Sequence, residues 1–139
     1  MGGPAPSVSQ LSTDTLLLRQ VNPNWFVKGE LSIAAFNPSK EQHYMASVDN
    51  GDGTSALSAY LYHQSNGLTT IGVVAATAGE ATRENLPVKA DPVAGWPHHM
   101  VLDFNALPDQ AGRRAAARAL TFAARQRGWL HNPLGHVTI

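Results

Sequence analysis

The sequence predicts an α+β domain, a single domain in which a mixed or mostly antiparallel sheet is packed against a long C-terminal helix. Short apolar, β-branched segments bounded by Pro, Gly or Asn recur along the chain and are typical of buried strands, whereas Pro108 and Gly128 enclose a long helical segment. At 139 residues, with 43% hydrophobic and 14% charged side chains, the chain has the size and composition of one globular domain. We expect a flexible lead-in over residues 1–13 and a single domain over 14–139.

The first half of the chain is expected to contain two strands and one helix. The strands cover residues 15–21 and 43–48. Residues 31–36 fit a strand or a helical turn equally well, because periodicity over so short a stretch does not separate the two. The helix covers residues 55–66, since this segment begins with a capping serine and ends before a glycine. Its predicted apolar face consists of Leu57, Tyr60 and Leu61.

The second half is expected to contain a buried strand, an edge strand, a third strand and the long helix. The β-branched segment 68–79 predicts the buried strand, and the polar segment 81–85 predicts a loop. Residues 86–90 are flanked by prolines, which favours a sheet edge. Residues 98–104 form the third strand, and the helix extends over 108–128, with proline at its first position.

Composition excludes several classes of function. Ten basic and ten acidic side chains give a formal net charge of zero, so we expect neither nucleic acid nor a membrane as a partner. The absence of cysteine excludes disulfides, thiolate nucleophiles and cysteine-ligated zinc. The sequence shows neither a signal peptide nor an apolar stretch long enough to cross a bilayer, and we therefore expect a cytoplasmic protein.

The histidines do not form a recognisable metal motif. His98 and His99 are adjacent, and neighbouring residues on a strand point to opposite faces, so one ion is not easily bound by both. We expect His99 to belong to a site and His98 to face solvent. Neither HExxH, GxGxxG nor a P-loop occurs, and we expect no metal and no resident cofactor.

Two further patterns favour ordinary structure over chemistry. The arginines on one face of the long helix are suited to phosphate, but few aromatic residues accompany them, and a solvated helix face is the simpler interpretation. These arginines are Arg114, Arg118 and Arg125. Ser32 or Ser47 could be combined with His99 and Asp103 into a hydrolytic triad, but no GxSxG elbow presents a serine. We therefore do not expect a serine hydrolase.

The segments LLLRQVNPNWFVKGELSIAAF, ASVDNG and DPVAGWPHHMVLDF resemble a family of uncharacterised bacterial proteins over about residues 16–130. The family pattern is Arg-x-x-His-Pro, Gly-x-x-Ser-x-x-Phe, Ser-Val and Asp-Pro followed by a histidine. Its positions here are Arg19, Asn22-Pro23, Gly29, Ser32, Phe36, Ser47-Val48, Asp91-Pro92 and His99. Asn22 stands where the family has histidine. If that histidine is catalytic in the family, this chain is impaired.

The order of these polar residues is also similar to that of small ADP-ribosyltransferase-like domains. The resemblance implies that NAD would bind in a cleft of a split sheet. The residues that would line this cleft are Arg19, Ser32, Ser47 and His99. Such domains use a catalytic glutamate, for which Glu80 and Glu84 are the available candidates, both in a predicted polar loop.

Two hypotheses of function therefore stay open, and they agree on the site. The first is a small bacterial binding or regulatory protein, an accessory of a defence, toxin or mobile-element locus, that takes a small-molecule ligand or a protein partner. The second is an ADP-ribosyltransferase-like enzyme that uses NAD. The predicted ligand contacts are Arg19, Asn22, Ser32, Ser47 and His99, and the predicted partner contacts are Trp25 and Trp96. We favour binding, because Asn22 does not titrate and no strong general base is evident.

Overall fold

The computed structural model describes residues 11–139, so most of the lead-in predicted for residues 1–13 lies outside the described residues. The chain forms a five-stranded sheet, in the order β5-β1-β4-β7-β6, in which every strand pairs antiparallel with its neighbours. Its strands are β1 (Leu16–Gln20), β4 (Met45–Asn50), β5 (Val73–Thr77), β6 (Val88–Ala90) and β7 (His99–Asp103). A separate two-stranded ribbon consists of β2 (Phe26–Val27) and β3 (Glu30–Leu31). The predicted α+β class is confirmed.

The helices α1 (Ala56–Ser65) and α3 (Gln110–Arg127) confirm the two predicted helices. The Ser55 hydroxyl caps α1 by accepting from the Ser58 N–H at 3.1 Å. The cap of α3 is the carboxylate of Asp109, so the preceding proline lies just outside the helix and not at its first position. Among residues 11–139, no helix combines the length and apolarity that crossing a membrane requires.

The segment 81–85, predicted to be a loop, belongs largely to a third helix, α2 (Ala78–Arg83). Thr77 and Glu80 explain this error, because they form a capping box: the Thr77 hydroxyl accepts from the Glu80 N–H, and the Glu80 carboxylate accepts from the Thr77 N–H. The strand predicted over 68–79 is therefore shorter than expected, since β5 ends where the capping box begins. Of the segment 31–36, which fitted a strand or a helical turn, Ile33–Phe36 form a short 3-10 helix.

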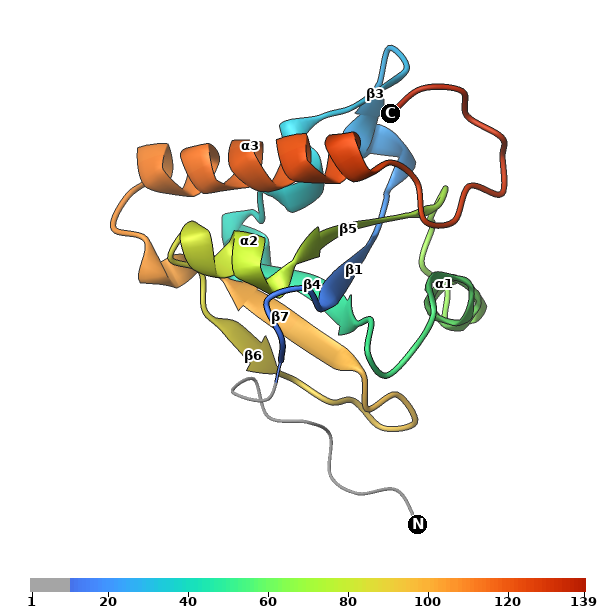
Figure 1. Ribbon diagram of the computed structural model, residues 1–139, viewed down its shortest axis with the longest axis horizontal. Coiled ribbons are helices and arrows are strands. Elements are labelled where there is room, and N and C mark those ends of the chain that lie inside the picture. The colour runs from blue at the N-terminus through green and yellow to red at the C-terminus, as the bar shows by residue number, and fades with distance from the viewer. Residues whose placement is uncertain (1–10) are drawn as a thin grey trace.

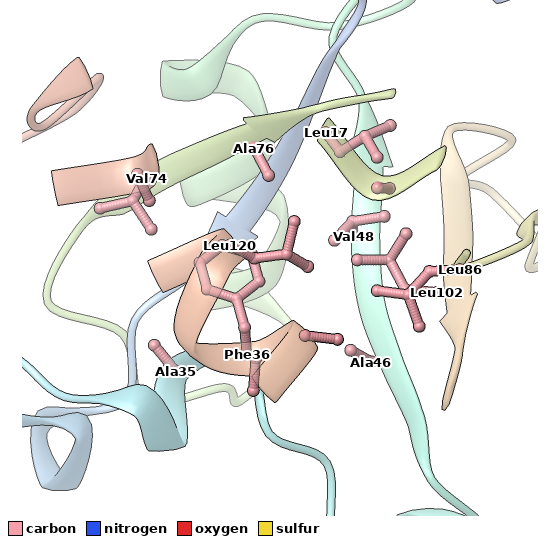
Figure 2. Close-up of a cluster of buried hydrophobic side chains, with 14 of the residues drawn as sticks. Leu17, Ala35, Phe36, Ala46, Val48, Val74, Ala76, Leu86, Leu102 and Leu120 are labelled. Carbon is pink, nitrogen blue, oxygen red and sulfur yellow. The ribbon is translucent and has the colours of Figure 1, made fainter. Parts of the chain in front are cut away.

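One face of the sheet is sealed by α2, α3 and the Ile33–Phe36 turn. Side chains from these elements and from the strands form a continuous apolar cluster. Figure 2 shows Phe36 and Leu120 side by side within this cluster, facing residues of the sheet such as Val48. Both Phe36 and Leu120 are essentially inaccessible to solvent, so this face is a closed core.

The opposite face is covered only in part. Figure 1 shows α1 on the other side of the sheet from α3, beside β1 and β5. Ala59 and Tyr60 of α1 pack against Leu18 and Val73 in a second, smaller apolar cluster. The predicted apolar face of α1 is wrong for its leucines, because Leu57 and Leu61 are about half exposed (51% and 50%) while Ala59 is buried.

The sheet is split between β1 and β4. β1 pairs with β5 along its whole length, and β4 pairs with β7 from Met45 to Asp49. Between β1 and β4, however, only Leu17 with Asn50 and Leu18 with Asp49 are paired. The two strands therefore separate beyond Leu18, and the split leaves an opening through which side chains from both faces of the sheet meet.

Candidate functional site

A cleft of about 340 Å³ occupies this split. Most of its lining residues have polar side chains. They come from β1, β4, β7, His63 of α1, the turn after β1, Gln42 and the segment 66–69. The residues with polar groups that matter most to the following argument are Arg19, Gln20, Ser47, Asp49, His63 and His99. A polar cleft at the junction of two diverging strands is the kind of position where small ligands bind.

Four of the five predicted ligand contacts line this cleft: Arg19, Asn22, Ser47 and His99. Ser32 does not line it. The sequence places Ser32 close along the chain, but the backbone turns there: its N–H donates to the Trp25 carbonyl at 2.8 Å, and the residue begins the Ile33–Phe36 turn. Trp25, predicted as a partner contact, lies in the cleft wall instead of Ser32.

Arg19 is a buried cation at the edge of the cleft. The residue is 7% exposed, and its Nε and Nη1 donate to the carbonyls of Ala35 and Ser47, each at 2.8 Å. Its guanidinium lies 4.6 Å from the centroid of the Trp25 ring. Burial lowers the pKa of Arg19 to about 10, which keeps it charged at neutral pH. None of the ion pairs formed within residues 11–139 includes Arg19, so no carboxylate compensates its charge.

Asp49 and His63 form a carboxylate–imidazole pair that the sequence did not reveal. Asp49 is 1% exposed, and its Oδ2 lies 2.7 Å from His63 Nε2. The indole Nε1 of Trp96 donates to the other oxygen, Oδ1, at 2.9 Å. The pair therefore fixes His63 in the wall of the cleft. Together, His63 and Trp96 hydrogen-bond both carboxylate oxygens of Asp49.

His99 lies opposite Asp49 in the ladder between β4 and β7. Its Nδ1 is 2.9 Å from the backbone oxygen of Asp91 and 3.1 Å from the Asp91 carboxylate. The neighbouring His98 was expected to face solvent, but it is half-buried with its ring centroid 4.8 Å from that of Trp96. The two histidines are therefore separated: His99 begins β7 and lines the cleft, whereas His98 lies in the preceding turn against Trp96.

The two tryptophans predicted to contact a partner are both partly buried. The Trp96 ring stacks on Tyr62 at 4.2 Å between centroids with the planes 7° apart, and its indole nitrogen is used by Asp49. Trp25 packs on Arg19. Trp25 lines the cleft, whereas Trp96 does not line it but contacts Asp49, which does; their use by a partner stays a prediction.

The side-chain amide of Gln20 is only partly hydrogen-bonded. Its Oε1 accepts from the Thr70 hydroxyl at 2.9 Å, whereas its buried Nε2 has no hydrogen-bond partner within residues 11–139. The residue is 8% exposed and lines the cleft beside Arg19. A buried amide donor without an acceptor is costly, so Gln20 Nε2 reduces the stability of this region.

Glu80 and Glu84, the glutamates implied by the ADP-ribosyltransferase resemblance, do not line the cleft. Glu80 caps α2 and pairs with Arg127 Nη2 at 2.9 Å. Burial raises its pKa, but hydrogen bonds from Arg127 and Thr77 outweigh this effect and leave the pKa below its ordinary value. Within residues 11–139, no group of three or more His, Asp or Glu side chains could hold a metal ion.

Sequence reasoning overlooked His63 and Asp49 for different reasons. The helix pattern drew attention to the apolar residues of α1, although His63 is one turn beyond the buried Ala59 and Tyr60 and so shares their face. Asp49 lies just beyond the strand predicted over 43–48, yet β4 extends through Asn50. Alternation from Ser47 would have placed Asp49 on the same face of the sheet.

No protein-family model, curated protein or solved structure matches the chain.

Proposed function

We propose that the protein binds a small phosphate-bearing ligand in the cleft between β1 and β4. The observation that carries this proposal is the buried, uncompensated guanidinium of Arg19 in the cleft wall. A buried charge without a counter-charge is expensive, and a bound anion removes that cost. Arginine also matches the geometry of phosphate oxygens with its planar set of N–H donors.

The remaining polar groups of the cleft are compatible with an anion. Both carboxylate oxygens of Asp49 are engaged by His63 and Trp96, so neither forms an ion pair with Arg19. The exposed Ser47 side chain offers a further hydrogen-bonding group at the cleft. The Trp25 ring, adjacent to Arg19, offers an apolar surface on which a base or sugar would pack.

Binding of such a ligand agrees with the first hypothesis from the sequence, a small binding or regulatory protein. In that role the protein would serve as an accessory of a bacterial defence, toxin or mobile-element locus. Ligand binding would then control how the surface around Trp25 and Trp96 meets a protein partner. The link is physical, because Trp25 contacts Arg19 and Trp96 contacts Asp49.

NAD is the second candidate ligand, favoured by the position of the cleft at a split in the sheet. The ADP-ribosyltransferase-like alternative would place its pyrophosphate at Arg19. However, both candidate catalytic glutamates lie outside the cleft. NAD binding would therefore occur here without the glutamate that such enzymes use, which is why we rank binding above transfer.

Isothermal titration calorimetry of the whole chain tests the proposal with AMP, NAD, inorganic phosphate and acetate. We expect AMP or NAD to bind more tightly than acetate. Arg19→Gln retains an amide donor near the Ala35 carbonyl but removes the charge. It should weaken binding about 10- to 100-fold, because hydrogen bonds to charged groups contribute roughly 1.5–3 kcal/mol.

Arg118→Gln is the matched control, since Arg118 is exposed on α3 and does not line the cleft. Its affinity for AMP should equal that of the unmodified protein. Equal losses in the two variants, or no binding of any phosphate ligand, would refute a site at Arg19.

A further inference from the structure

The cleft holds two histidines, and each is anchored through one ring nitrogen. His63 Nε2 lies 2.7 Å from Asp49 Oδ2, and His99 Nδ1 lies 2.9 Å from the backbone oxygen of Asp91. Both rings line the same cleft. The opposite nitrogens, His63 Nδ1 and His99 Nε2, have no hydrogen-bond partner within residues 11–139. Each histidine therefore has one nitrogen available for chemistry.

The anchoring partners determine where the ring protons sit. A carbonyl oxygen and an ionised carboxylate only accept hydrogen bonds, so His63 Nε2 and His99 Nδ1 must donate. In a neutral ring the opposite nitrogen then carries a lone pair and acts as a base. In a charged ring that nitrogen carries a proton and acts as an acid. Either histidine is consequently suited to either role.

The two imidazoles share one neighbour. Asp49, which holds His63, is paired across the ladder with His99, and directly opposed residues on antiparallel strands have Cα atoms about 4.5–5.5 Å apart. The cleft that both rings line also contains the buried guanidinium of Arg19. One cavity thus contains two proton-transfer groups and one uncompensated cation.

We propose that His63 and His99 act as a general acid–base pair that cleaves small ribonucleotide phosphodiesters in the cleft. This inference rests on the proposed phosphate-binding function and adds a reaction to it. Displacement at phosphorus requires one proton to leave the nucleophile and another to reach the leaving group, and two imidazoles supply both transfers. The Arg19 guanidinium matches the negative charge on the phosphoryl oxygens. A ribose supplies its own nucleophile, the 2′-hydroxyl.

The step is balanced without any further reactant. One histidine, in its neutral form, removes the proton of the 2′-hydroxyl while O2′ forms a bond to phosphorus. The bond between phosphorus and the 5′-oxygen of the next nucleoside breaks, and the other histidine, in its charged form, donates its proton to that oxygen. The products are a 2′,3′-cyclic phosphate and a free 5′-hydroxyl, and the two histidines have exchanged protonation states.

Asp49 is a positioning residue in this scheme. In Asp49→Asn the amide oxygen still accepts from Trp96, but the amide nitrogen donates to His63 Nε2 and forces the proton onto Nδ1. Cleavage should then fall at least about 100-fold, a typical contribution of acid–base catalysis. The ¹⁵N chemical shifts of His63 read the tautomer directly, and a loss of rate without this change of tautomer would contradict the assigned role.

The central test measures cleavage of the dinucleotide uridylyl-3′,5′-adenosine by the whole chain. His63→Gln and His99→Asn are the variants of choice, because each amide reproduces the anchored nitrogen without a titratable group. We expect each to lower the cleavage rate at least about 100-fold and to change dinucleotide affinity far less than the rate. His43→Asn, at an exposed histidine outside the cleft whose φ of 55° asparagine tolerates, should keep the full rate and controls for contaminating nucleases.

The outcomes separate the reaction from the binding. The deoxyribose analogue, which lacks the 2′-hydroxyl, should bind and stay intact. If the unmodified protein binds the dinucleotide but cleaves it no faster than the His63→Gln/His99→Asn double variant, the acid–base inference is overturned while phosphate binding stands. If calorimetry detects no binding of the dinucleotide or of AMP, the proposed function fails as well.

Discussion

The two faces of the sheet differ in how completely they are covered: one is a closed apolar core and the other carries a cleft. On the face covered by α3, Phe36, Leu102 and Leu120 fill the space against the strands, and the cluster is sealed. On the opposite face α1 covers β1 and β5, but β4 and β7 present Ser47 and His99 to a cleft. The first face supplies stability through apolar burial. The second presents Asp49, His63 and His99 at an opening, which Arg19 reaches from the first face because it alternates with Leu18 along β1.

The difference shows how one sheet provides both rigidity and chemistry. Side chains alternate between the faces of a strand, so β4 contributes Val48 to the core and Asp49 to the cleft. The closed core fixes the backbone from which the cleft residues project. The two faces should accordingly respond differently to substitution, with loss of stability on one side and loss of ligand contacts on the other.

The largest expected effect is on the closed face. Phe36→Ala removes a fully buried ring from the core under α3 and should lower the free energy of unfolding by about 3–5 kcal/mol. Urea denaturation followed by circular dichroism measures this change. Ser47→Ala on the open face is the contrasting variant, and it should cost less than about 0.5 kcal/mol because that side chain is exposed. Similar losses in both variants would abolish the distinction between the faces.

A smaller effect is expected at the polar contact between Trp96 and Asp49 on the open face. Trp96→Phe preserves an aromatic ring on Tyr62 but removes the indole donor of the buried Asp49 carboxylate. Leaving a buried acceptor with one donor fewer should cost about 1–3 kcal/mol. The same denaturation experiment measures it. A loss below that of Ser47→Ala would show that Trp96 does not support the cleft.

The cap between β5 and α2 should contribute less again. Thr77→Ala removes the hydroxyl that accepts from the Glu80 N–H, and loss of such a cap typically costs about 1 kcal/mol. The thermal unfolding midpoint gives the measurement. Thr77→Ser retains the hydroxyl and should recover most of the difference, so failure of serine to restore stability would count against the capping interpretation.

The smallest effect concerns acid sensitivity at the open edge of the sheet. The hydrogen bond from Lys89 lowers the pKa of Asp103, burial opposes this, and Asn105 adds to the lowering. Because the folded pKa lies below the ordinary value of 3.8, the unfolded chain takes up the proton first. The stabilisation is therefore present above the unfolded pKa and is lost as pH falls through the folded pKa.

Lys89→Met should flatten this acid-induced loss of stability. The change should stay below about 1 kcal/mol, since Lys89 is half exposed and solvent screens the pair. Denaturation curves measured from neutral pH down to acid for both proteins give the comparison. An unchanged pH dependence in Lys89→Met would mean that Lys89 does not lower the pKa of Asp103.

Local sequence patterns were sufficient for most elements of the fold. Ser55 and Gly128 marked helix ends because capping is a local interaction, and prolines placed β6 at the edge of the sheet. The same kind of signal was present but overlooked at Thr77 and Glu80, whose capping box begins α2. Elements were therefore predictable wherever neighbouring residues determine the backbone.

The site was only partly predictable, because it depends on contacts between distant segments. Arg19, Asn22, Ser47 and His99 line one cleft, and their contact with a ligand stays a prediction. The Asp49–His63 pair joins a strand to a helix, and its formation depends on how α1 packs against the sheet. The split between β1 and β4 is likewise a feature of strand pairing that periodicity along a single strand does not contain.

The most direct test of a phosphate site in the split sheet is a ¹H–¹⁵N correlation spectrum recorded while AMP is titrated into the whole chain. The Nε–H signal of Arg19 and the indole signals of Trp25 and Trp96 report on the cleft, while backbone signals of α3 report on the closed face. We predict saturable shifts at Arg19 and Trp25 with α3 unchanged. Shifts confined to the exposed arginines of α3, or no saturable shifts at Arg19, would contradict the proposed site.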